Sequence, residues 1–146
     1  MFQFNLQPLL FKRKFTEKIR KKELAELKRK LEKENEKLLA CREREDRLVR
    51  EMNEKTRQHT SVSELMMYAL SHQQVTEHIK RQRDKVDASK AESREGRDRL
   101  LNAMKNRKAL DRLKEKRWMA YRKEEARKEQ AFLSEIAIQQ FNRKSD

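Results

Sequence analysis

The sequence predicts an all-α protein, a long antiparallel two-helix coiled-coil hairpin whose second helix overhangs at the C-terminal end. Of its 146 residues, only 35% are hydrophobic and 44% are charged, which leaves too little apolar surface for a multilayer core. The chain contains one glycine and one proline, so residues that stop helices or form turns are scarce. Apolar residues recur at heptad spacing, as they do where two helices wrap around each other.

The first helix is expected over about residues 6–57, with Pro8 in its first turn, where a missing amide hydrogen costs nothing. The inward positions a and d of one heptad frame are filled by Leu24, Leu27, Leu31, Leu38, Cys41, Leu48 and Met52. Glu34 and Glu45 fall in the same seam, and polar residues there weaken apolar contact. We therefore expect a helix pair of modest stability.

The chain is expected to reverse over about residues 58–62, where the apolar seam stops. Ser61 followed by Glu64 is the pattern of a capping box, which satisfies free amide groups at a helix start. The second helix is expected over about residues 63–133, and its heptad-like series consists of Leu65, Val75, Ile79, Val86, Leu100, Met104, Leu110, Leu113 and Tyr121. A C-terminal tail is expected over about residues 134–146, so residues 1–146 form a single hairpin.

A turn centred near Thr60 sets which residues face each other across the hairpin. It places Leu10 opposite the region of Asp111, and Gly96 opposite the neighbourhood of Ala25. Two small residues there would allow the helix backbones to approach closely, and a hinge at Gly96 is the alternative. The last part of the second helix then has no partner helix.

The sequence contains no pattern typical of a catalytic, cofactor-binding or metal-binding site. His59, His72 and His78 share no i, i+3 or i, i+4 spacing, and Cys41 is the only cysteine. Neither a glycine-rich phosphate loop nor a glycine-flanked serine nucleophile is present. We expect a protein that is not an enzyme and needs no cofactor. The single cysteine favours the reducing cytoplasm, and no apolar run is long enough to span a bilayer.

The formal net charge of +14 predicts affinity for acidic surfaces without choosing among acidic protein, nucleic acid and anionic lipid. A basic coiled-coil arm that binds RNA through phosphates is one alternative. Glu and Asp are interleaved throughout, however, and no long basic region leads into a leucine zipper. Nucleic acid is therefore not the expected partner.

Aromatic residues gather near the two ends of the chain, which a hairpin brings together. They are Phe2, Phe4, Phe11 and Phe15 at one end, and Trp118, Tyr121, Phe132 and Phe141 at the other. Aromatic side chains in a charged rod are good binding anchors, since each offers a large apolar surface at low entropic cost. Phe4 and Trp118 are equally well explained as residues that close the open end. Partner contact is favoured for residues past the overlap, which are Phe132, Ile136, Ile138 and Phe141.

The chain resembles the FliJ family of bacterial flagellar export proteins over nearly its whole length. The N-terminal residues Phe4, Leu6, Leu9 and Leu10 carry part of the resemblance, as do Tyr68, Val75, Ile79 and Gln82 near the start of the second helix. The most specific part is the C-terminal series made of Ala103, Arg107, Lys108, Leu110, Leu113, Lys114, Glu115, Lys116, Tyr121, Glu125, Glu129, Gln130, Glu135, Ile136, Ala137 and Phe141.

The resemblance implies a stalk of the flagellar type III protein export apparatus, similar to the rotor subunit of rotary ATPases. Its partners would be the export ATPase, the cytosolic domain of the export gate and export chaperones. It would be cytoplasmic, at the inner face of the cell membrane only through these partners. The ATPase-binding residues would be Phe4, Leu6, Leu10, Trp118, Tyr121, Phe132, Ile136 and Phe141. The gate-binding residues would be Tyr68, Val75, Ile79 and Gln82. The equivalent stalk of a virulence secretion system is a second interpretation.

Overall fold

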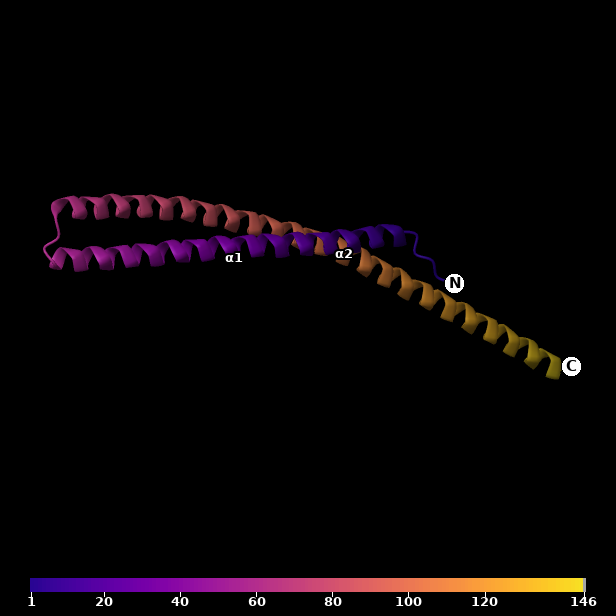
Figure 1. Ribbon diagram of the computed structural model, residues 1–146. Helices are drawn as coiled ribbons and strands as arrows, with labels where there is room; N and C mark the ends of the chain where they lie inside the picture. The colour runs from indigo at the N-terminus through magenta and orange to yellow at the C-terminus, as the bar shows by residue number, and fades with distance from the viewer. Residues whose placement is uncertain (146) are drawn as a thin grey trace. The chain divides into compact units, whose positions relative to one another are not determined.

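The computed structural model describes residues 1–145, with side chains as far as Phe141. It consists of two helices, α1 (Gln7–Arg57) and α2 (Val62–Ser145), joined by a short turn (Figure 1). The two helices pack together as a hairpin, which confirms the predicted all-α fold. The chain is divided into two compact units. We call residues 19–101 the turn unit, and residues 1–18 together with α2 from residue 102 the terminal unit.

The reversal of the chain in the turn unit is built by a small set of hydrogen bonds. The Gln58 amide and the Thr60 hydroxyl both donate to the Lys55 carbonyl, which satisfies an acceptor at the end of α1. His59 adopts a left-handed conformation with φ of 54°, which reverses the backbone direction. The Ser61 hydroxyl accepts a hydrogen bond from the Glu64 amide at 3.3 Å, so Ser61 caps the start of α2 as predicted.

The seam predicted for the turn unit faces inward. Leu24, Ile79 and Val86 are buried, and the remaining predicted seam residues of α1 are half-buried. Gln82 is also buried, and its amide nitrogen donates to the carbonyl and the carboxylate of Glu34 across the hairpin, at 3.0 and 2.6 Å. The polar residue predicted to interrupt the seam is thus satisfied by a partner on the other helix.

Gly96 faces α1 in the predicted neighbourhood of Ala25, and its nearest contacts there come from Leu24 and Leu27. A Cβ atom added to Gly96 would lie 2.7 Å from Cδ1 of Leu27 and 4.0 Å from Cα of Leu24. Ala25, the predicted neighbour, is exposed. The space above the glycine is therefore filled by leucine side chains, because Leu24 and Leu27 occupy the seam positions that flank Ala25.

The terminal unit has its own inward residues and its own polar bridge. Leu10 is 1% exposed, and Phe4 and Ala103 are buried. Arg107 donates both to Glu17 on α1 and to Asp111 one turn along α2. Its guanidinium pKa is raised chiefly by the hydrogen bond that it donates to Glu17, so the bridge keeps its charge.

The C-terminal part of α2 corrects one expectation, because the tail predicted from residue 134 is helical as far as Ser145. The Ser134 hydroxyl donates to the Gln130 carbonyl at 2.8 Å, four residues earlier. A serine that bonds back to the preceding turn is compatible with a continuing helix. No described helix is both long and apolar enough to cross a membrane.

Candidate partner-binding surfaces

Aromatic side chains from both ends of the chain form a cluster in the terminal unit. The Phe2 ring lies 5.2 Å from that of Trp118 in an edge-to-face arrangement and 5.7 Å from that of Tyr121. Trp118 and Tyr121 are themselves stacked, with centroids 6.0 Å apart. Arg117 places its guanidinium 5.7 Å from the centre of the Phe4 ring. These contacts hold the N-terminal segment against α2.

The predicted ATPase-binding residues therefore fall into two groups. Phe4 and Leu10 are buried, Leu6 and Tyr121 are half-buried, and Trp118 belongs to the aromatic cluster, so these five hold the terminal unit together. The other group lies on the part of α2 that runs past Tyr121. It consists of Phe132 and Phe141, which are largely exposed, and Ile136, which is half-exposed.

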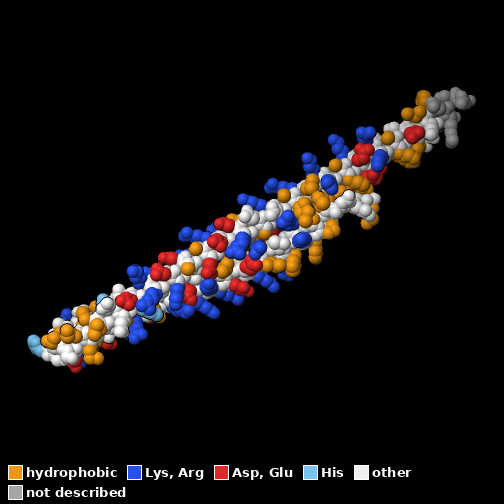
Figure 2. All heavy atoms as spheres, turned by 90° about the horizontal axis from the view of Figure 1, so that it is seen from above, with side chains coloured by type: hydrophobic (Ala, Val, Ile, Leu, Met, Phe, Trp, Pro, Cys, Tyr) orange, Lys and Arg blue, Asp and Glu red, His pale blue; other side chains and the backbone are white. Residues whose placement is uncertain are grey.

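This second group belongs to a broad apolar surface that the sequence alone only partly indicates. Leu133 and Ile138 are exposed beside Phe132 and Phe141, and Figure 2 shows hydrophobic side chains gathered toward this end of the chain. Exposed apolar residues clustered on a charged helix are typical of a surface that a partner covers. Ile138 was among the residues expected to contact a partner, whereas Leu133 was missed because an unpaired helix imposes no heptad frame on its residues.

The predicted gate-binding residues lie on α2 in the turn unit, and the structure separates them by exposure. Ile79 and Gln82 are buried between the helices at 5% and 4% exposure, whereas Tyr68 and Val75 are half-buried. Ile79 packs in the seam and Gln82 holds Glu34, so both already have an intramolecular role. Contact of these four residues with a partner stays a prediction.

A more exposed apolar patch lies closer to the turn, and we call it the turn patch. Its members, all on the first turns of α2, are Val62, Met66, Met67 and Leu70. Figure 2 shows hydrophobic side chains next to histidine at this end of the molecule. A signal in the sequence marks the region: residues 58–79 contain no Lys or Arg, although the chain has 39 of them. Methionine is a flexible residue that adapts to varied partners.

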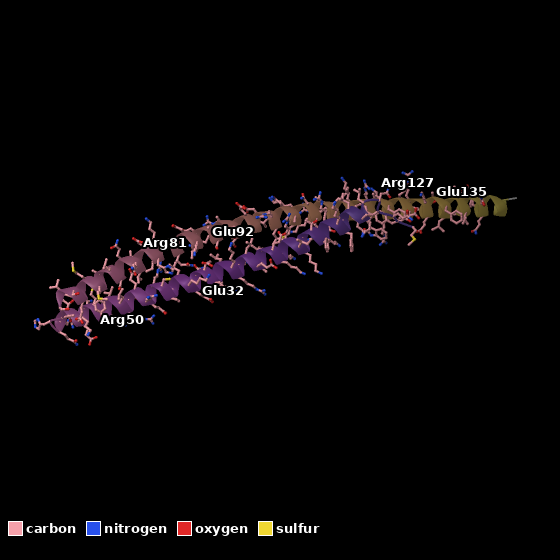
Figure 3. The ribbon with its side chains drawn as sticks, turned by 45° about the horizontal axis from the view of Figure 1, so that its top comes forward. Glu32, Arg50, Arg81, Glu92, Arg127 and Glu135 are labelled. Carbon is pink, nitrogen blue, oxygen red and sulfur yellow. The ribbon has the colours of Figure 1, made fainter. Side chains whose placement is uncertain are left out.

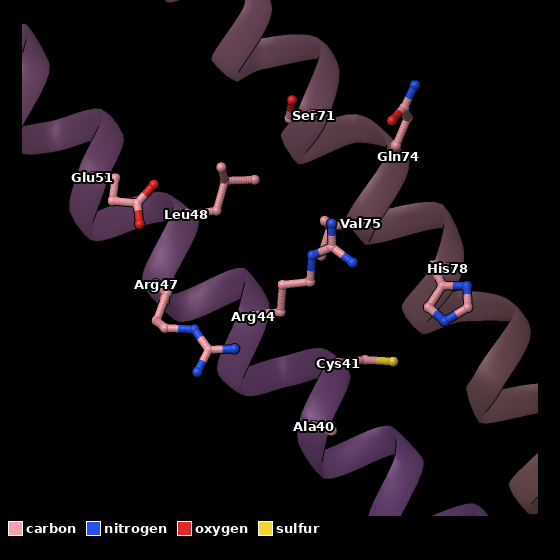
Figure 4. Close-up of a pocket in the computed structure, with 10 residues that line it drawn as sticks. All are labelled: Ala40, Cys41, Arg44, Arg47, Leu48, Glu51, Ser71, Gln74, Val75 and His78. Carbon is pink, nitrogen blue, oxygen red and sulfur yellow. The ribbon is translucent and has the colours of Figure 1, made fainter.

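A groove of about 800 Å³ opens between the helices of the turn unit, where small side chains occupy the seam (Figure 4). Cys41 and Leu48 point into it from α1, and Val75 and His78 border it on α2. Arg44 from α1 also borders the groove. The groove contains no arrangement of nucleophile and base, and the described residues include no cluster of His, Cys, Asp and Glu able to hold a metal ion.

Charged side chains cover most of the remaining surface and pair with each other at several points (Figure 3). Lys30 on α1 bonds Glu92 on α2 at 2.7 Å, and Arg81 lies 3.6 Å from Glu77 on the same helix. Lys37 donates to Glu34, and this bond together with the one from Gln82 lowers the pKa of Glu34. Many cations are thus already matched by carboxylates in the turn unit.

Comparison with known protein families identifies the family of this chain. The family model described as flagellar FliJ protein matches residues 2–146. The chain belongs to the FliJ family. Comparison with curated proteins gives no match.

The fold is shared with a solved structure. A chain described as a YscO homologue from Chlamydia trachomatis is similar to this FliJ-family chain with a TM-score of 0.73 and 22% sequence identity. The similarity covers 100% of both chains. At this identity the likeness concerns the hairpin fold.

Proposed function

We propose that this FliJ-family chain is a non-enzymatic stalk of the bacterial flagellar type III protein export apparatus. It engages the export ATPase ring with the C-terminal part of α2, and the cytosolic domain of the export gate with the first part of α2. ATP hydrolysis belongs to the partner, because the described residues offer no catalytic constellation. The family match over residues 2–146 supports the assignment to flagellar export. An escort role toward export chaperones is part of the same proposal.

The observation that carries the ATPase contact is the exposed apolar surface beyond the aromatic cluster. α2 continues from Tyr121 to Ser145, and Phe132 is 63% exposed in this stretch. Burying large apolar side chains of this kind against a partner is a main source of binding free energy. We therefore assign the contact to Phe132, Ile136 and Phe141, and leave the buried Phe4 and Leu10 as structural support.

For the gate, the proposal rests on the turn patch together with Tyr68 and Val75. The patch is exposed and apolar, and residues 58–79 around it contain no Lys or Arg. Ile79 and Gln82 lie beneath the surface and would act by fixing the helix pair that presents the patch.

A reciprocal pair of variants tests both contacts in one experiment. Phe132→Ala with Ile136→Ala is expected to weaken capture by the export ATPase at least tenfold, because each anchor removed from an interface centre typically costs over 1 kcal/mol. Met66→Ser with Leu70→Ser should instead weaken capture by the gate domain. Each variant should keep the other interaction, so each serves as a control for folding. ATPase stimulation that survives the first variant would refute the assigned contact.

A second candidate is the equivalent stalk of a virulence type III secretion system, favoured by the fold shared with the YscO homologue. Capture by the flagellar ATPase and not by a virulence-system ATPase supports the flagellar assignment. The reverse preference would replace it.

A further inference from the structure

The outer face of α1 in the terminal unit carries two aromatic side chains that no other part of the hairpin covers. Phe11 is 71% exposed and Phe15 is 59% exposed, and they lie one helical turn apart. Leu10 and Glu17, which are buried, mark the opposite side of the same helix. At 100° per residue, Phe15 lies about 140° from Leu10 and about 160° from Glu17. The two phenylalanines thus point away from the buried side of α1.

Lysines border this aromatic pair on both sides. By the same helical rotation, Lys12 and Lys18 lie about 60° to either side of Phe15, and Lys14 about 100° from it. All three are exposed. We call Phe11, Phe15 and these three lysines the basic aromatic face.

The basic aromatic face contains no carboxylate. Residues 1–22 include seven Lys and Arg but one acidic residue, Glu17. That carboxylate is buried and accepts a hydrogen bond from Arg107. The positive charge of this face is therefore not neutralised by a neighbouring acid on the same surface, in contrast to the paired charges of the turn unit.

We propose that the basic aromatic face binds the surface of an anionic lipid bilayer, an interaction beyond the proposed stalk function. Phenylalanines insert at the boundary between headgroups and acyl chains, while flanking lysines keep their ammonium groups among anionic headgroups. The convex side of a single helix suits a flat surface. An acidic protein would have to supply a groove to cover the same residues, so the bilayer is the occupant that this shape favours.

The test uses the full chain and vesicles of phosphatidylcholine alone or with about a third phosphatidylglycerol, separated by flotation. Binding is expected only to the anionic vesicles, and it should fall as salt is raised, because added ions screen the attraction. Replacing Phe11 and Phe15 by Gln should weaken partitioning at least tenfold at constant net charge. The matched control replaces two other exposed residues, Leu39 on α1 and Leu101 on α2, by Gln and should bind like the unmodified chain.

The lysines are tested against a control of equal charge. Replacing Lys12, Lys14 and Lys18 by Gln should weaken partitioning roughly a hundredfold, since each lysine near an anionic surface contributes about fivefold. Replacing Lys33, Lys80 and Lys105, which are exposed elsewhere, removes the same charge and should have a much smaller effect. Equal loss in both triple variants would overturn the proposal, since binding would then follow total charge. Loss of ATPase capture with unchanged vesicle binding would also overturn it, in favour of an acidic protein surface.

Discussion

Gly96 allows a sharp test of how the two helices of the turn unit pack. Replacing Gly96 with Ala adds a methyl group 2.7 Å from Cδ1 of Leu27 and 3.6 Å from Cδ1 of Leu24. Alanine stabilises a helix interior by about 1 kcal/mol relative to glycine. The nearest atom is the end of a half-buried leucine side chain, which can rotate away, so we expect overpacking to offset most of that gain. The net change in unfolding free energy should be within about 0.5 kcal/mol of zero.

A double-mutant cycle separates the two effects. Leu27→Ala removes the atom that the new methyl group meets, so Gly96→Ala should stabilise this background by about 1 kcal/mol. Urea unfolding followed by circular dichroism at 222 nm measures all four proteins. If Gly96→Ala also stabilises the unmodified chain by about 1 kcal/mol, the new methyl group does not collide with Leu27. If it loses more than about 2 kcal/mol in both backgrounds, the backbone of Leu24 and not the side chain of Leu27 limits the space.

Three further predictions concern the turn and the polar bridge of the turn unit. His59→Gly should stabilise the protein by about 1 kcal/mol in urea unfolding, because glycine adopts positive φ without a steric cost; a loss would mean that the imidazole matters more than the backbone. Ser61→Ala should cost about 1 kcal/mol through loss of the helix cap, and Ser61→Asp, which keeps an acceptor, should not. The pKa of Glu34 is lowered in the folded protein. The stabilisation of the folded state by its carboxylate is therefore complete above the unfolded pKa of 4.5 and is lost as pH falls through the lower folded pKa. Stability should therefore decline below about pH 4.5 and decline less in Glu34→Gln; parallel pH profiles would contradict this.

Heptad spacing was enough to predict which residues of α1 face inward between Leu24 and Met52, whereas Phe15 and Ile19, predicted to continue the apolar stripe upstream, are exposed. Leu24, Leu31 and Leu38 recur every seven residues, and a helix that presents one apolar stripe can bury it in few ways. The predicted turn near Thr60 also gave a good pairing register for the two helices. It places Gln7 on α1 opposite Lys114 on α2, and Lys114 donates a hydrogen bond to Gln7 at 2.9 Å. These successes rest on periodicity, which a single sequence displays directly.

The C-terminal part of the chain was harder to predict because nothing there pairs with α1. Ser134 was interpreted as the start of a tail, although no Gly or Pro follows it and its hydroxyl bonds within the helix. The candidate site shows the same limit. Ile79 and Gln82 were assigned to a partner surface from the family resemblance, but whether a residue points inward depends on the opposite helix. Phe132 could be assigned to a partner surface from the sequence because the predicted turn fixed where the overlap of the two helices ends.

The polar bridges explain how a seam with few apolar residues can still favour one alignment of the two helices. A repeating seam of leucines fits nearly as well after a shift of one heptad, so apolar contact alone specifies register weakly. Gln82 with Glu34 in the turn unit, and Glu17 with Arg107 in the terminal unit, would lose their partners on such a shift. A half-buried carboxylate or guanidinium left without a partner is costly, whereas the paired state adds little net stability. Each unit thus contains a polar bridge that makes a shifted alignment unfavourable, which keeps the basic aromatic face and the turn patch at fixed positions along their own units.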